Sequence, residues 1–229
     1  MKMFRRIFLT ILICFPSLFS LGATVEQLFY CSFAKGEWNS KEWIQVKSPR
    51  WDYSGSWIQG TSYIENKTPK GATPKEMLGT RAPETYTSMV LQKKCKGDIT
   101  ISSTMEFTDR MAPLIVIAPE IGKSKSGLPE YREHYEVVVF DRGINVWHHY
   151  FRNGKPYWKK AAYSQFKLLP NTKYKLKVKI SHTDKGKMLA VIIEDHEMGY
   201  LDDSLPDDFY VGITGCEGVN RFYDFSLEK

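Results

Sequence analysis

The most constraining feature of the sequence is a strict alternation of apolar and basic side chains over Lys173–Ser181. Tyr174, Leu176, Val178 and Ile180 alternate with lysines. A period of two places successive side chains on opposite faces of an extended strand, so the segment predicts a β-strand with one buried and one solvated face. The lysine row could contact an anionic polymer, but it is more typical of the outer face of an antiparallel sheet.

The rest of the chain also predicts β-structure. No segment after residue 24 carries an apolar stripe at helical spacing, whereas many short stretches alternate or are rich in β-branched and aromatic residues. The 229 residues are 42% hydrophobic and 25% charged, which is typical of a globular protein. One all-β sandwich of two antiparallel sheets is expected over residues 24–229. The Gly- and Pro-rich segments 66–85 and 119–131 predict loops that either border a cleft or are flexible.

The first 23 residues have the pattern of a secretory signal peptide. Lys2, Arg5 and Arg6 precede an apolar run from Ile7 to Leu21, and small residues follow. The run is shorter than a membrane span, so cleavage after residue 22 or 23 is expected, together with a secreted or periplasmic location. Removal of three basic residues and no acidic residue lowers the net charge from +6 to +3. Nucleic acid is therefore not an expected partner.

A series of short motifs in the second half of the sequence carries a family resemblance. In order they are Tyr135-Glu136, the stretch 169–180, Val211-Gly212-Ile213 and the closing stretch 222–227. Their order resembles that of the concanavalin A-like lectin/glucanase superfamily, and within it is most similar to secreted bacterial domains called 3-keto-disaccharide hydrolase-like. The resemblance implies a jelly roll whose concave sheet binds sugar in many relatives. The Glu-x-Asp-x-x-Glu motif of the glucanases is absent, which argues against retaining glucanase chemistry.

A polar cluster is expected on the hairpin that spans residues 134–151. A three-residue turn at Asp141-Arg142-Gly143 would place Glu136 opposite His148 and His134 opposite Tyr150, with Trp147 and Phe151 on the core face. A turn of two or four residues would instead make Glu136 face His149. The cluster could be a solvated polar pair, could bind sugar hydroxyls, or could move protons with Glu136 and His148 as the catalytic groups.

Several aromatic side chains are candidates for stacking on sugar rings, because the C–H face of a pyranose packs on an aromatic plane. The candidates are Trp57, Trp147, Tyr157 and Trp158. Each could equally be a core or loop residue. Trp158 is the most promising, because it precedes Lys159 and Lys160 and follows a predicted turn.

The resemblance also implies two structural features. Relatives often hold calcium between the first and last strands, and Asp224 matches the acidic position of the closing motif. With Glu37 as the only other ligand in view, a capped strand end is the competing interpretation. Cys31 and Cys216 fall on elements that are neighbours in such a fold, which predicts a Cys31–Cys216 disulfide, with buried free thiols as the alternative.

The sequence therefore predicts a secreted protein that binds carbohydrate on the concave face of a β-sandwich. The alternatives are a glycoside hydrolase-like enzyme acting on 3-keto-disaccharides or related glycosides, and a non-catalytic structural or interaction module. A sequon at Asn66-Lys67-Thr68 would matter only in a eukaryotic source.

Overall fold

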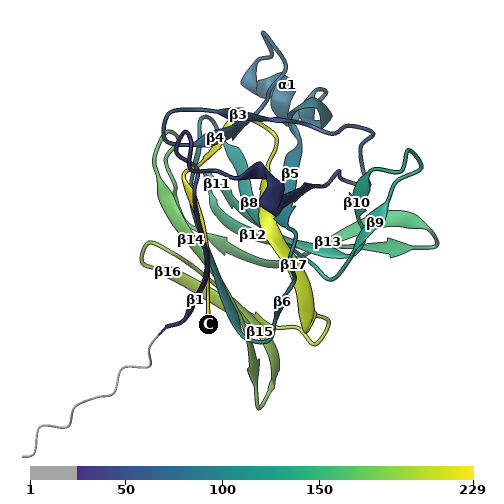
Figure 1. Ribbon diagram of the computed structural model, residues 1–229, viewed down its shortest axis with the longest axis vertical. Helices are drawn as coiled ribbons and strands as arrows, with labels where there is room; N and C mark the ends of the chain where they lie inside the picture. The colour runs from purple at the N-terminus through teal and green to yellow at the C-terminus, as the bar shows by residue number, and fades with distance from the viewer. Residues whose placement is uncertain (1–24) are drawn as a thin grey trace, which may run out of the picture.

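The computed structural model describes residues 25–229, which form two antiparallel β-sheets stacked on each other (Figure 1). The predicted all-β, two-sheet antiparallel sandwich is confirmed. The predicted signal peptide at residues 1–23 lies outside the described residues. Among residues 25–229 there is no helix long and apolar enough to cross a membrane.

The first sheet has nine strands. The first and last strands of the chain both belong to it and lie side by side in Figure 1. Along its main path the strands are β16 (His196–Leu201), β15 (Gly186–Ile193), β14 (Tyr174–Thr183), β7 (Ile99–Phe107), β18 (Asn220–Phe222), β4 (Ile64–Asn66) and β3 (Trp57–Gln59). The remaining two are β1 (Gln27–Ser32) and β19 (Asp224–Glu228), which pair with each other while β19 also pairs with β7.

The second sheet has eight strands and carries the candidate site. In spatial order they are β13 (Lys155–Gln165), β12 (Gly143–Arg152), β11 (His134–Phe140), β8 (Met111–Ala118), β17 (Asp208–Gly215), β5 (Thr87–Leu91) and β2 (Trp43–Gln45), with β6 (Cys95–Lys96) beside β17. A separate small sheet consists of β9 (Ile121–Lys123) and β10 (Pro129–Tyr131), within the segment predicted as a loop.

The other segment predicted as a loop, 66–85, contains helical turns. It holds α1 (Pro74–Leu78) and the 3-10 helix η2 (Ala82–Thr85), and a further 3-10 helix, η1 (Ser40–Glu42), precedes β2. α1 begins with a capping box: Thr73 Oγ1 accepts from the Glu76 backbone N–H, and the Glu76 carboxylate accepts from that of Thr73. The sequon residue Asn66 is buried and donates its side-chain amide to the carbonyls of Thr85 and Gly218.

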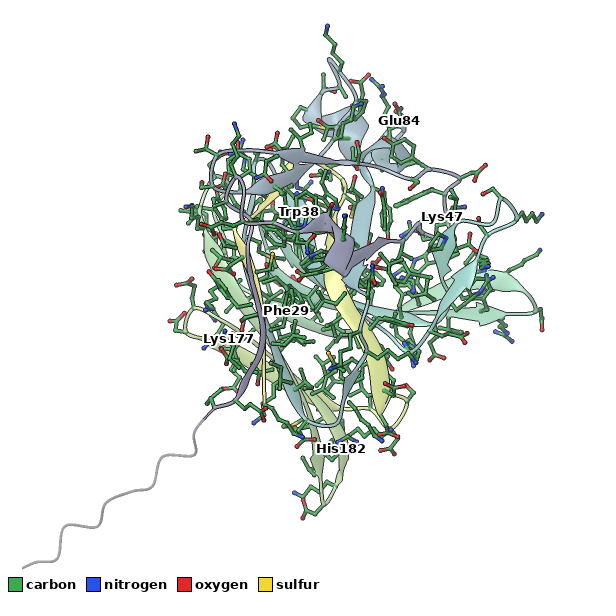
Figure 2. All side chains as sticks on the ribbon, in the orientation of Figure 1. Phe29, Trp38, Lys47, Glu84, Lys177 and His182 are labelled. Atoms are coloured by element: carbon green, nitrogen blue, oxygen red, sulfur yellow. The ribbon has the colours of Figure 1, made fainter. Side chains whose placement is uncertain are left out.

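The alternating segment at residues 173–181 folds as predicted. Tyr174, Leu176, Val178 and Ile180 of β14 are buried in the core between the sheets, and the lysines between them are exposed. Lys177 points away from the sandwich in Figure 2. One face of the strand is buried because removal of apolar area from water is favourable, and the other is exposed because the ammonium groups remain hydrated.

A second apolar cluster covers the opposite face of the eight-stranded sheet. Its strand residues, Val90, Leu114, Val116 and Val138, project away from the nine-stranded sheet and are covered by residues from connecting segments such as Tyr86. We call this the outer face of the eight-stranded sheet. Because both faces of β8 and β11 are covered, these strands are almost wholly buried and give the outer face a rigid base.

Candidate functional site

The turn between β11 and β12 sets which side chains share the outer face. Phe140 pairs with Gly143, so the turn holds two residues, not the predicted three. Gly143 has a φ of 120°, and a Cβ at this position would overlap the Ser164 carbonyl, so glycine allows β12 to begin directly after Arg142.

The predicted pairing of Glu136 with His148 is therefore wrong by one residue. The observed Cα partners are His134 with His149, Tyr135 with His148 and Glu136 with Trp147. A shift of one residue exchanges the faces of one strand relative to the other. Trp147, predicted for the core, lies instead on the outer face with Glu136, and the predicted pair of His134 with Tyr150 does not form.

Glu136 contacts two histidines on the outer face. Its Oε2 lies 3.0 Å from His149 Nε2, and its Oε1 lies 3.5 Å from His134 Nε2. The contact between Glu136 and His149 agrees with the alternative prediction, although it is diagonal across the strand pair. All three side chains are buried.

Four aromatic and imidazole rings form a row across neighbouring strands. His134 stacks on Tyr131 of β10 with ring centroids 4.6 Å apart and on His149 at 4.5 Å, and His149 stacks on Trp158 of β13 at 6.4 Å. At the inner end, Tyr131 Oη lies 2.7 Å from Ser88 Oγ. The row fixes the orientation of both imidazoles through packing on either side.

The charge states in this cluster follow from burial and proximity. Burial opposes ionisation of Glu136, but the neighbouring His149 and His134 outweigh it, so the pKa of the Glu136 carboxyl lies well below its usual range. Burial lowers the pKa of His134, against the opposing effect of Glu136. His134 Nδ1 lies 3.0 Å from the Arg132 carbonyl oxygen, which can only accept, so this nitrogen carries a proton.

Beside the cluster the outer face is hollowed into a pocket of about 180 Å³, which we call the outer pocket. Its lining includes charged and imidazole side chains and three indoles, namely Arg50, Glu136, Glu217, His149, Trp51, Trp147 and Trp158. The Arg50 guanidinium lies between two of the indoles, with Cζ 4.4 Å from the Trp51 ring centroid and 4.6 Å from that of Trp158. Trp158 is nevertheless 47% exposed, which leaves indole surface free for a ligand.

Glu217 is a second carboxyl group in the outer pocket. It directly follows Cys216 after β17 and has a φ of 56°, in the left-handed region that non-glycine residues seldom adopt. Its backbone N–H donates to Thr85 Oγ1 at 2.7 Å, which holds the turn. Burial raises the pKa of Glu217; Arg50 opposes this effect and Glu136 adds to it. Glu136 and Glu217 therefore have pKa values shifted in opposite directions within one pocket.

Other predicted site residues lie on the opposite face of β12 and β13. His148 stacks on Tyr135 with ring centroids 4.3 Å apart, and its Nε2 lies 2.7 Å from Glu133 Oε1. Tyr150 and Tyr157 stack at 6.3 Å beside it. The structure thus separates His148, Tyr150 and Tyr157 from Glu136, His134 and Trp158, and they do not form one site.

Trp57, also predicted to bind sugar, packs edge-on against Phe222 with ring centroids 5.6 Å apart and is partly buried against the core. The Asp224 carboxylate accepts hydrogen bonds from the backbone N–H of Thr104 at 2.7 Å and from its hydroxyl at 2.8 Å. These contacts agree with the competing interpretation of a capped strand end. A role of Asp224 as a calcium ligand stays a prediction.

The predicted Cys31–Cys216 disulfide is not formed. Cys31, Cys95 and Cys216, the cysteines that the structure describes, are free and buried. Cys31 belongs to the core between the sheets, whereas Cys216 belongs to the cluster on the outer face, so the eight-stranded sheet separates the two thiols. Strand neighbourhood alone does not bring two Cβ atoms within bonding geometry.

The sequence interpretation missed Arg50 and Glu217 as site residues. Arg50 lies between β2 and β3, and Glu217 follows β17, so both come from connecting segments that are far apart in the sequence. The one sequence signal for Glu217 is its place between Cys216 and Gly218, directly after a strand end. Arg50 precedes Trp51 in a similar connecting segment, a pairing that suits exposed recognition surfaces.

Searches with known proteins find similar folds but no family. No protein-family model and no curated protein matches the chain. A carbohydrate-binding module, CBM66 from Bacillus subtilis, aligns with a TM-score of 0.54 and 14% identity over 82% of this chain and 96% of that one. Basic winged bean lectin, solved with Tn-antigen, aligns with a TM-score of 0.55 and 10% identity over 90% and 98%.

A third similar structure is the cellulose-induced protein Cip1, with a TM-score of 0.55 and 9% identity over 87% of this chain and 96% of that one. At these identities the likeness concerns the fold. The narrower resemblance to 3-keto-disaccharide hydrolase-like domains stays a prediction. The chain thus adopts the two-sheet jelly-roll sandwich of concanavalin A-like proteins.

Proposed function

We propose that the chain binds a saccharide in the outer pocket. The observation that carries the proposal is the exposed indole of Trp158, which lies at a pocket that also presents a guanidinium and two carboxyl groups. An aromatic plane packs against the C–H face of a sugar ring, while charged groups hydrogen-bond to its hydroxyls. This combination suits a polar ligand with one apolar face.

The fold neighbours support the same proposal. They include a carbohydrate-binding module and a lectin solved with Tn-antigen. A further lectin, solved in complex with galactose, aligns with this chain with a TM-score of 0.52. These ligands belong to those proteins. What they add here is that this sandwich serves carbohydrate recognition in several proteins of very different sequence.

Neighbouring residues of β13 provide a matched test. Trp158 and Tyr157 are 47% and 44% exposed, but only Trp158 lines the outer pocket. A glycan array identifies a bound saccharide, and calorimetry then compares Trp158→Ala with Tyr157→Ala. We expect Trp158→Ala to weaken binding at least about tenfold and Tyr157→Ala to leave it unchanged. Failure of the folded protein to bind any saccharide, or an equal effect of both variants, would contradict the proposal.

Hydrolase-like activity on 3-keto-glycosides is a second candidate. The observation that favours it is the pair of carboxyl groups in the outer pocket with oppositely shifted pKa values, an arrangement that suits one proton donor and one ionised group. Release of product from a 3-keto-glycoside would be measured for the wild type, Glu136→Gln and Glu217→Gln. Turnover that both variants abolish supports the enzyme, and binding without turnover supports the recognition protein.

We also propose that the protein is exported through its first 23 residues. Their basic start, apolar run and small residues at the end support cleavage after residue 22 or 23. The intact mass of protein recovered outside the cytoplasm tests this: loss of 22 or 23 residues is expected, and a full-length mass would contradict it.

A further inference from the structure

Three ligating side chains converge at the edge of the outer pocket. His134 and Glu136 are alternate residues of β11 and so project on the same face, and His149 is the cross-strand partner of His134 on β12. One ligand atom of each lies within 4.8 Å of the other two. Within residues 25–229 no other group of three His, Cys, Asp or Glu side chains converges in this way.

The imidazole nitrogens that face Glu136 approach its carboxylate without well-formed hydrogen bonds. His134 Nδ1 holds its proton toward the Arg132 carbonyl, so in the neutral ring the Nε2 lone pair points to Glu136 Oε1 at 3.5 Å. His149 is buried, with 6% of its side chain exposed, and its Nε2 lies 3.0 Å from Glu136 Oε2 without the geometry of a hydrogen bond. Where imidazole nitrogens and a carboxylate meet in a buried site, a positive charge between them, either a proton or a metal ion, is favourable.

We infer that His134, Glu136 and His149 bind a zinc ion. Two imidazole nitrogens and one carboxylate oxygen are a zinc ligand set, whereas calcium prefers six or more oxygens. Bonds of about 2.0–2.1 Å in a tetrahedral site place the ligand atoms roughly 3.3 Å apart. His149 Nε2 lies 3.0 Å from Glu136 Oε2 and His134 Nε2 lies 3.5 Å from Oε1, close to this value, and one ligand atom of each residue lies within 4.8 Å of the other two.

The surroundings of the three residues resemble those of a prepared site. The Arg132 carbonyl on Nδ1 fixes the tautomer of His134 and the direction of its free nitrogen, as an outer partner does for a metal-bound histidine. The rings of Tyr131 and Trp158 flank the two imidazoles in the row described above. Both imidazoles are therefore held in place by packing and need only small shifts toward the ion.

The inferred zinc would lie at the wall of the outer pocket. Glu136 and His149 both line it, so the remaining coordination position opens toward the pocket and can accept water or an oxygen of a ligand. The inference goes beyond the proposed saccharide binding and does not depend on it, because zinc affinity is measured without a saccharide.

Adjacent histidines of β12 provide the test. His149 is a proposed ligand, whereas His148 points to the opposite face and contacts Glu133. Zinc chloride is titrated by calorimetry into the full chain after removal of metals with a chelator, and cobalt(II) is added in parallel as an absorption probe. We expect one zinc per chain in the wild type and in His148→Gln, and at least tenfold weaker binding in His149→Gln.

Glu136→Gln keeps the shape of the side chain and serves as the second variant, with circular dichroism to check that each variant is folded. It should also weaken zinc binding at least tenfold. The inference is overturned if the folded wild type binds no zinc, or if folded Glu136→Gln and His149→Gln bind zinc as the wild type does. It is also overturned if His148→Gln is the variant that loses binding.

Discussion

The imidazole of His134 stacks on that of His149 with ring centroids 4.5 Å apart and an interplanar angle of 13°. This contact depends on the two-residue turn, because pairing of Phe140 with Gly143 places the two histidines opposite each other. A turn longer by one residue would move His149 out of this position and would break up the cluster around Glu136. The length of a solvent-exposed turn thus determines the composition of a buried site.

Gly143→Ala should destabilise the fold and disturb the cluster. Gly143 has a φ of 120° and a Cβ there would meet the Ser164 carbonyl, whereas Gly154 has a φ of 73° and open space where a Cβ would lie. Gly154→Ala should lose about 1–2 kcal/mol of unfolding free energy from backbone conformation alone. Gly143→Ala should lose clearly more. Urea unfolding measures both, and an equal loss would show that the close approach to Ser164 is unimportant.

Leu176→Ala should be strongly destabilising, because its side chain is fully buried between the sheets. Removal of a buried leucine side chain lowers the free energy of unfolding by about 2–5 kcal/mol. The control is Lys177→Ala on the exposed face of the same strand, expected to change stability by no more than about 0.5 kcal/mol. Chemical denaturation tests the pair, and similar losses for both would contradict the two-faced description of β14.

Glu217→Gln should alter how stability depends on pH. Burial raises the pKa of Glu217 in the folded state, so the folded protein loses stability as pH rises through the unfolded and then the folded pKa of this group. Below the unfolded pKa, about 4.3, no such loss remains. The glutamine variant should therefore gain stability relative to wild type between pH 4 and neutral pH. A difference that stays constant with pH would contradict this assignment.

His182 should stabilise the fold only when protonated. It lies near the end of the molecule opposite Glu84 in Figure 2, between the carboxylates of Asp207 and Asp98, each 2.8 Å from one ring nitrogen. Asp207 and Asp98 raise its pKa. Its contribution is thus complete below about pH 6.5 and is lost as pH rises through the folded pKa. Proton NMR should show a lower His182 pKa in Asp98→Asn; an unchanged pKa would exclude Asp98 as a cause.

The thiols should be unreactive in the folded protein. Burial raises the pKa of Cys31 to about 12 and that of Cys95 to about 11, with nearby acidic groups adding to the effect, and Cys216 is shifted upward too. In a Cys14→Ser variant, Ellman's reagent should label these three thiols only after denaturation. A reducing agent should leave the melting temperature unchanged. A melting temperature lowered by the reducing agent would instead support the predicted Cys31–Cys216 disulfide.

The parts of the fold that sequence predicts well are those that depend on local periodicity. The alternation over β14 determines its buried face without knowledge of its neighbours, and the same holds for the overall β-class. Register is different, because it depends on the turn and on packing against β8 and β13. An error of one residue at Gly143 exchanged His148 for His149 and moved Trp147 to the other face.

The site was predictable only in part, for a related reason. Glu136, His134 and Trp158 lie on paired strands whose order the sequence suggests, and they do converge on the outer face. Arg50 and Glu217 reach the same pocket from two connecting segments, and no local pattern links them. The prediction of a Cys31–Cys216 disulfide was wrong because elements that are neighbours in a fold can still present their side chains to opposite faces of a sheet.

Arg50, which lies between Trp51 and Trp158, belongs to a part of the outer pocket that differs from the sheet in its tolerance to change. Strands β8 and β11 of the sheet supply a base in which almost every side chain is buried, so substitutions there threaten folding. The connecting segment that carries Arg50 contacts β13 through the guanidinium, which lies over the Trp158 ring. For the saccharide site that we propose, exchange of this segment would change selectivity while the framework stays constant, much as in antibody loops, and a library restricted to residues 48–54 is the starting point for redesign.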